Sequence, residues 1–136
     1  LSRRQRQMCI RDRGSNVQLY VSTFYQEGGS PKFDDGIKAW LNEDSTAMTN
    51  NGGNDTIAAV TAMGYDAYYV ALEALKAAGS TDPAAVKAAL PGVTYTGVTG
   101  DIAFDDIGDA IRDTAYIKVA DTANNAWALE TMQKAG

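Results

Sequence analysis

The chain has 136 residues, the length of one ordinary domain, and 45% of them are hydrophobic, which is enough for a buried core. No run of about 18 uninterrupted apolar residues occurs, so the sequence offers no candidate membrane helix. Residues 14–136 carry seven basic and 16 acidic side chains, a net charge of −9, which argues against a nucleic-acid or anionic-membrane partner.

Residues 1–13 differ from the rest of the chain. They read LSRRQRQMCIRDR, with five arginines and no apolar run that would suit a signal peptide. This string resembles the translated adapter found at the ends of assembled metagenomic reading frames; a basic arm or a disordered tail are the alternatives. We expect the natural sequence to start near Gly14 and to lack the portion that preceded it. The one cysteine, Cys9, lies in this segment.

The first half of the remaining chain predicts one strand and two helices. Residues 17–23 alternate apolar and polar side chains, as a strand does. Apolar residues form one face of a helix over 31–42, and the polar stretch 43–54 predicts a loop. A long helix follows over 55–78, with Asn54 or Asp55 as its N-cap and Gly79 ending it.

The second half turns from helix to strand. Proline in the sequence STDP predicts a helix from 82 to about 90. β-branched residues and turn signals then predict four strands, over 94–98, 101–104, 114–119 and 126–131, the last two forming a hairpin. This order predicts an α/β protein whose sheet is incomplete within the chain.

The residue types available argue against catalysis and against a metal site. Residues 14–136 contain neither histidine nor cysteine, so the usual nucleophile–base pairs cannot form, and we expect no enzyme activity and no cofactor. The sequence DDIGD at 105–109 has neither the glycine position nor the distal glutamate of an EF-hand loop. We therefore interpret it as an acidic β-turn.

Two further features have competing interpretations. The sequence NGGN at 51–54, placed before the long helix, suits a plain helix cap better than a site for a carboxylate. The tyrosines at 65, 68 and 69 suit the core of a buried helix better than the lining of a pocket.

Three motifs in order resemble the C-terminal third of the leucine/isoleucine/valine-binding-protein family. They are GYDA at 64–67, STDP at 80–83, and GVTG at 97–100 followed by FDDIGD at 104–109. The resemblance covers roughly residues 17–120. It implies part of a two-lobed, Rossmann-like architecture of the periplasmic-binding-protein type 1, with residues 14–136 contributing to both lobes. It places 17–23 and 31–42 in the C-terminal lobe and the helices 55–78 and 82–90 in the N-terminal lobe, and it returns the chain to the C-terminal lobe through 93–105.

The same resemblance implies a small set of ligand contacts at the start of the long helix. An aromatic residue that packs on the solute in some relatives falls on Val60 here, or on Ile57 or Thr61 if the register differs. Thr56 adjoins this stretch, and Tyr25, next to Phe24, lies near an expected lobe crossing. We therefore predict the following ligand-binding residues: Thr56, Ile57, Val60, Thr61 and Tyr25.

The function implied is that of the extracytoplasmic solute-binding component of an ABC transporter, with no cofactor and no metal. Such proteins capture branched-chain or other small amino acids by cleft closure and deliver them to permease subunits. The resemblance implies a periplasmic protein or a cell-surface lipoprotein, with a signal peptide that this segment does not include. A ligand-sensing domain of a receptor or a regulator with the same fold is the alternative.

Overall fold

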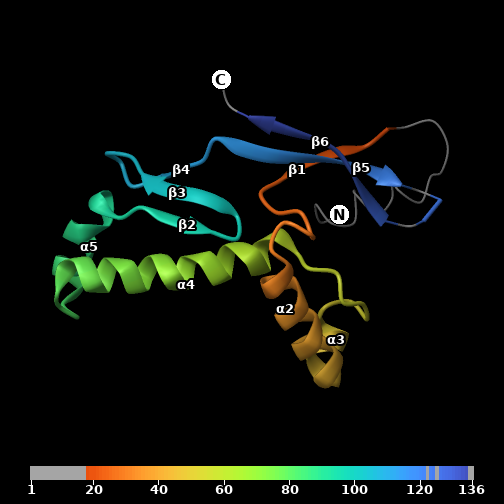
Figure 1. Ribbon diagram of the computed structural model, residues 1–136, viewed down its shortest axis with the longest axis horizontal. Helices are drawn as coiled ribbons and strands as arrows, with labels where there is room; N and C mark the ends of the chain where they lie inside the picture. The colour runs from red at the N-terminus through yellow and green to blue at the C-terminus, as the bar shows by residue number, and fades with distance from the viewer. Residues whose placement is uncertain (1–17, 122, 125, 135–136) are drawn as a thin grey trace, which may run out of the picture. The chain divides into compact units, whose positions relative to one another are not determined.

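The computed structural model describes residues 18–121, 123–124 and 126–134 (Figure 1). The basic segment 1–13 and Cys9 lie outside the described residues. The chain divides into two compact units, which we describe separately. Residues 24–113 form the helical unit; residues 1–23 and 114–136, as far as they are described, form the strand unit.

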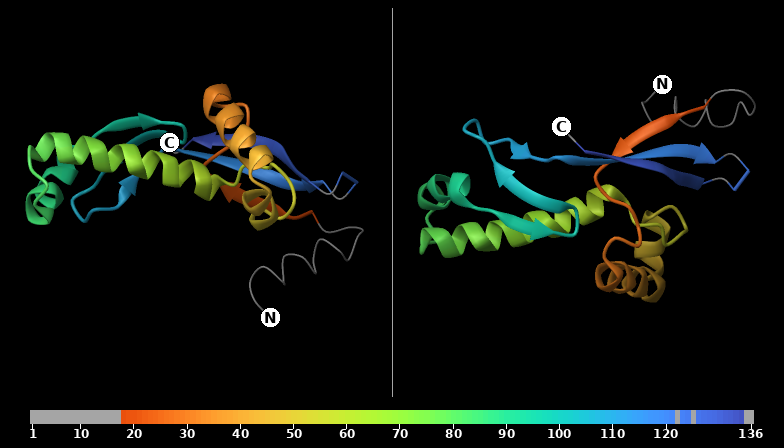
Figure 2. Two further views of the ribbon diagram at one scale, coloured as in Figure 1. Left: turned by 90° about the horizontal axis from the view of Figure 1, so that it is seen from below. Right: turned by 45° about the horizontal axis from the view of Figure 1, so that its top comes forward.

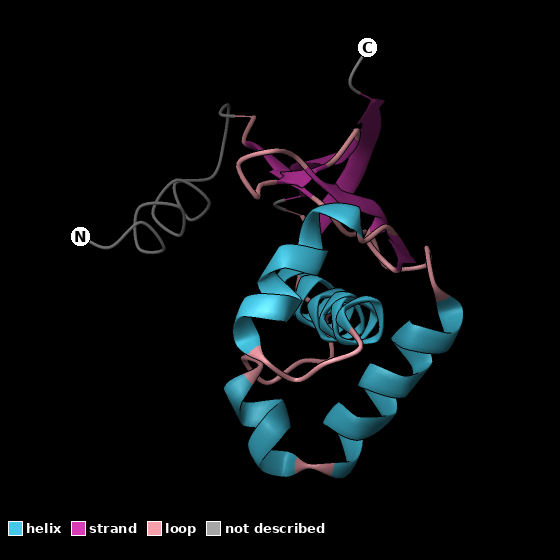
Figure 3. Cartoon of the chain, turned by 90° about the vertical axis from the view of Figure 1, so that its left-hand side faces the viewer, coloured by secondary structure: helices cyan, strands magenta, loops and turns pink. Residues whose placement is uncertain are grey.

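Every helix described belongs to the helical unit (Figure 3). The first helix is α2, Pro31–Glu43, which begins with a proline because that position needs no backbone N–H donor. The longest is α4, Ala59–Ala78, which ends where Gly79 adopts a left-handed conformation with φ of 58°. In α5, Pro83–Ala89, the Asp82 carboxylate accepts a bond from Ala85 N at the helix start. A 3-10 turn, Leu90–Gly92, follows.

The structure corrects two sequence expectations in this unit. The predicted loop 43–54 contains the short helix α3, Ser45–Asn50, whose start is capped by the Asp44 carboxylate. Its polar side chains concealed it, because only Ala47 is buried. The long helix begins at 59 instead of 55, and neither predicted cap is used. Asn54 Oδ1 accepts from Thr56 N within the preceding turn.

Three short antiparallel strands follow the helices and run beside α4 (Figure 1, Figure 2). They are β2, Tyr95–Gly97, β3, Gly100–Phe104, and β4, Ala110–Ile111, paired in that order. The turn between β3 and β4 is the predicted acidic turn. Its Asp105 carboxylate accepts hydrogen bonds from Ile107 N at 3.0 Å and from Asp109 N at 2.8 Å. These bonds lie within the turn and stabilise it.

Two clusters of buried apolar side chains hold the helical unit together. One joins the chain before α2, α2 itself and the start of α4 through four residues: Tyr25, Phe33, Ile57 and Ala62. The other joins the middle of α4 to the strands: Val70, Ala74, Val93 and Ile102. Through Phe33, α2 packs on the start of α4. Strand β3 belongs to the same unit, which ends at residue 113.

A buried carboxylate on α4 fixes the turn between β2 and β3. Asp66 is fully buried and accepts bonds from Val98 N at 2.8 Å, Thr99 N at 2.8 Å and Thr99 Oγ1 at 2.5 Å. Gly97 passes so close to this carboxylate that a Cβ there would clash with it. Hydrogen bonds to a buried carboxylate are strong, so this contact ties segments more than thirty residues apart.

The strand unit is an antiparallel sheet in the order β1-β5-β6. Its strands are β1, Tyr20–Thr23, β5, Thr114–Asp121, and β6, Ala126–Lys134, with a register shift between Ile117 and Lys118. The expected strand at 17–23 and the hairpin at 114–131 are confirmed within the described residues. The two units together are α/β with incomplete sheets, as predicted. Over the described ranges no helix has the length and apolarity to span a membrane.

Candidate functional site

A hollow in the helical unit lies where α2, α3 and the start of α4 converge. Its volume is about 230 Å³. Three of the five predicted ligand-binding residues line it, namely Thr56, Ile57 and Thr61. The remaining lining comes from α2, from α3 and from the residue that follows α3: Ile37, Trp40, Leu41, Ala47, Asn50 and Asn51. An apolar wall with several neutral polar groups suits a small solute with an aliphatic part.

The segment that carries these residues is held in place from two sides. Glu27 accepts a bond from Ile57 N at 2.6 Å and forms an ion pair with Lys38 Nζ at 2.9 Å. That pair raises the pKa of Lys38, because the hydrogen bond and the charge of Glu27 both favour the ammonium form. Asn51 Nδ2 donates to the carbonyl of Thr56 at 3.0 Å. The backbone on which Thr56 and Ile57 sit is therefore fixed to both α2 and α3.

The other two predicted residues do not line this hollow. Val60 is 73% exposed on the outer side of α4. Tyr25 is only 2% exposed, and its hydroxyl donates a short bond to Asp34. Asp34 is buried as well and accepts a second bond from Gly28 N at 2.7 Å. Burial first, and then the bond to Asp34, raise the pKa of Tyr25 well above its ordinary value. Tyr25 is thus part of the core.

Sequence reasoning missed Trp40 as a member of the site. Its ring lines the hollow and is 55% exposed. The sequence placed Trp40 on the apolar face of the helix, which is typical of a core residue. This part of the apolar face of α2 borders a hollow because α3 lies beside it, and the polar sequence of α3 did not predict a helix. Asn50 and Asn51 were missed as lining residues for the same reason.

The predicted cap or carboxylate site at 51–54 is not supported. These residues end α3 and precede an extended stretch, while α4 starts only at Ala59. Asn51 and Asn54 bond to the backbone of their own loop. Both interpretations required a helix start directly after the loop, so both are wrong.

Two of the three tyrosines of α4 are exposed and do not occupy the predicted core positions. Tyr65 is 39% exposed and Tyr68 63%, so the predicted core position is wrong for both. They belong to a row of touching rings. Ring centroids lie 4.9 Å apart between Tyr65 and Tyr69, 5.4 Å between Tyr68 and Tyr69, and 5.9 Å between Tyr69 and Tyr95. Tyr95 and Tyr69 are stacked almost parallel, at 5°.

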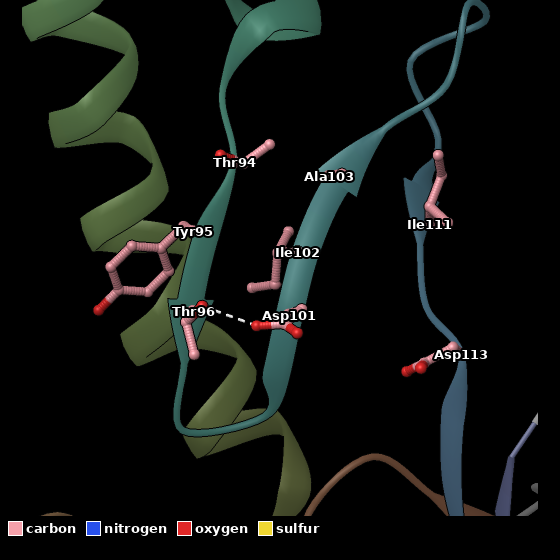
Figure 4. Close-up of a pocket in the computed structure, with 8 residues that line it drawn as sticks. All are labelled: Thr94, Tyr95, Thr96, Asp101, Ile102, Ala103, Ile111 and Asp113. Atoms are coloured by element: carbon pink, nitrogen blue, oxygen red, sulfur yellow. Dashed lines mark hydrogen bonds between the residues drawn. The ribbon is translucent and has the colours of Figure 1, made fainter.

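A second, larger hollow of about 410 Å³ lies on the β2–β3–β4 sheet (Figure 4). Its lining includes residues of all three strands, and Thr96 Oγ1 donates to Asp101 Oδ1 at 2.7 Å between β2 and β3 (Figure 4). None of the predicted ligand-binding residues lies there. No group of three or more histidine, cysteine or acidic side chains able to hold a metal occurs among the described residues. We take the hollow beside α2 and α3 as the candidate site.

Comparison with known proteins gives two kinds of match. The family described as "Periplasmic binding protein" matches residues 15–124. The solved structure of a leucine-binding protein from Thermotoga maritima is similar, with 26% identity and a TM-score of 0.60 over 85% of this chain and 31% of that one. A solute-binding protein of an ABC transporter from Rhodopseudomonas palustris HaA2, in complex with p-hydroxybenzoic acid, is 18% identical with a TM-score of 0.55.

The second of these alignments covers 88% of this chain and 32% of the neighbour, and at this identity it shows the fold alone. The chain thus spans about a third of the length of either structure. A comparison with curated proteins gives no match.

Proposed function

Since this chain belongs to the periplasmic binding protein family, we propose that it forms the C-terminal part of a solute-binding component of an ABC transporter. The sequence resemblance is confirmed at the level of the family and the fold. The solute we propose is a branched-chain or other small amino acid. The similarity to a leucine-binding protein supports this choice.

The observation that carries the proposal is the hollow lined by Thr56, Ile57 and Thr61. At about 230 Å³ it suits an aliphatic side chain better than a large ligand. None of the described residues that line it is ionisable. A buried carboxylate or ammonium group needs charged or hydrogen-bonding partners, so we propose that residues outside this chain hold the charged end of the amino acid.

We further propose that the helical unit and the strand unit contribute to different lobes of the complete protein. In such a protein the open form captures the solute and the closed form docks on the permease. The free energy for closure comes from the higher affinity of the closed state for the solute, so no chemical step is needed. This mechanism requires an extracytoplasmic location, in the periplasm or on the cell surface, which we propose with the function.

The test is a thermal-shift screen of the complete protein that carries this chain, against amino acids, amides and small carboxylates. We expect leucine, isoleucine or valine to raise the melting temperature in a saturable way. Calorimetry then gives the dissociation constant. A protein that melts cooperatively but responds to none of these solutes would contradict the proposal.

Two substitutions test whether the hollow is the binding site. We expect Trp40→Ala to weaken solute binding by about tenfold, as truncation of an aromatic contact commonly does. Thr61→Val should change the affinity with little effect on the melting temperature, because Thr61 is exposed and the two side chains have similar volumes. Val60→Ala is the matched control on α4, since Val60 lies outside the hollow. Equal effects of the three variants on the solute affinity would contradict the assignment of the hollow as the binding site.

A further inference from the structure

The chain passes twice between the helical unit and the strand unit, and a contact within the helical unit joins the residues beside these two passages. The passages lie at 23–24 and 113–114. Phe24 is the first residue of the helical unit, and Arg112 is the last residue but one. The Arg112 guanidinium lies over the Phe24 ring, 5.2 Å from its centroid. This is the geometry of a cation–π contact, which is strongest for a guanidinium placed over a ring face.

The same guanidinium is bonded to the turn between β2 and β3. Arg112 Nη1 donates to Thr99 Oγ1 at 2.8 Å and to the carbonyl of Thr99 at 3.3 Å. Thr99 is in turn held by the fully buried Asp66, to which its N–H and its hydroxyl both donate. A continuous series of contacts therefore runs from Phe24 through Arg112 and Thr99 to the middle of α4.

The choice of residue fits this arrangement. Arg112 is the only arginine after residue 13. A lysine in its place would present a single ammonium group, whereas a planar guanidinium can stack on a ring and donate to two oxygens at once. The position therefore uses properties that are specific to arginine.

We propose that Arg112 is a positioning residue that fastens both passages to α4, so that they move together as one pivot when the protein opens and closes. This inference rests on the proposed function for the motion, but the contact itself is independent of any solute. Its test therefore uses no ligand, and its failure is distinct from a failure of solute binding.

The test measures distances between spin labels in the complete protein that carries this chain, after its other cysteines are replaced by serine. One pair joins the two units, with labels at Glu130→Cys in β6 and Lys87→Cys in α5. A second pair lies within the helical unit, at Lys32→Cys in α2 and again Lys87→Cys. All three labelled positions are exposed. The width of each distance distribution reports how firmly the two labelled positions are held.

We expect Arg112→Ala to broaden the distribution of the pair that joins the units and to leave the pair within the helical unit unchanged. Loss of the ring contact and the hydrogen bonds should raise about tenfold the population of molecules in which the passages are not held to α4. Arg112→Lys should restore part of the original width, and Phe24→Leu should broaden the same pair. Lys76→Ala is the charge control, because it removes an exposed ion pair on α4.

Three outcomes would overturn the proposal. In the first, Arg112→Ala changes neither distribution. In the second, it broadens both pairs equally, which is the signature of a general loss of packing. The third is a wild-type chain that already shows a broad distribution within the helical unit.

Discussion

The helical unit and the strand unit differ in how deeply they bury their side chains. The helical unit has two clusters of buried apolar residues and two buried carboxylates, Asp34 and Asp66. In the strand unit no described residue is fully buried, and Leu129 and Met132 are 47% and 50% exposed. Since hydrophobic burial and satisfied buried polar groups dominate stability, the helical unit should carry most of the unfolding free energy of this chain.

The largest effect should come from Asp66→Ala. The substitution removes the acceptor of three partly buried donors, namely Val98 N, Thr99 N and the Thr99 hydroxyl, and we expect it to lower the unfolding free energy by about 4 kcal/mol. Urea denaturation measures this loss. Asp35→Ala, at an exposed position of the neighbouring helix, is the control and should have little effect. Similar losses in both variants would show that the Asp66 contacts contribute little.

A matched pair of leucines compares the two units directly. Leu41 is 4% exposed in α2, and its replacement by alanine should cost about 3 kcal/mol. Leu129 is 47% exposed in β6, and the same substitution there should cost about 1 kcal/mol or less, because little packing is lost. Both are read from denaturant midpoints. A larger loss for Leu129 would reverse our comparison of the units.

The sequence predicts the features of this fold that depend on neighbouring residues. The start of α2 at Pro31, the end of α4 at Gly79 and the start of α5 at Pro83 each follow from a local signal. Features that depend on distant contacts were missed. Four of the six residues of the short helix α3 are polar. The exposure of Tyr65 and Tyr68 depends on what packs against α4.

The candidate site shows the same limit. Ile57 and Thr61, which line the hollow, were predicted from the family resemblance only as alternatives to Val60, with Thr56 as their neighbour. Trp40 was missed, since its place beside the hollow depends on α3. The partners of Asp66 lie 32 and 33 residues away, and no local pattern specifies such a pairing.

Stability at alkaline pH tests the contact between Tyr25 and Asp34 in the core of the helical unit. Burial and the bond to Asp34 raise the pKa of Tyr25 above its ordinary value of 10.0, so its neutral form is favoured in the folded chain. This stabilisation is fully present below pH 10 and is lost as the pH rises further. Tyr25→Phe should cost about 2 kcal/mol at pH 7 and make stability less sensitive to pH above 10.

The measurement is urea denaturation at a series of pH values from 7 upward. Tyr20→Phe is the control, because Tyr20 is 46% exposed in the strand unit. The pKa values of Tyr65 and Tyr95 are also raised, so the Tyr25 variant should retain part of the pH dependence. An unchanged profile in Tyr25→Phe would show that the Tyr25–Asp34 contact is not the cause.

The smallest effect should come from the hairpin of the strand unit. The Asp121 carboxylate accepts bonds from the side chain and backbone of Asn124, and these lower its pKa. Its contribution is therefore present above pH 3.8 and is lost as the pH falls through the lowered value. Asp121→Ala should speed amide exchange in the hairpin and leave exchange at Val70 in α4 unchanged. Faster exchange at Val70 as well would couple the hairpin to the helical core.

The close passage of Gly97 over Asp66 makes two distant positions of the sequence interdependent. Any side chain at 97 would occupy the space of the carboxylate, so a change there must be matched by a smaller residue at 66. Gly97→Ala and Asp66→Ser, each harmful alone, should therefore be less harmful together than their separate losses add up to. Homologous chains that lose one of these residues should lose the other, and a library that varies only one position will recover few folded members.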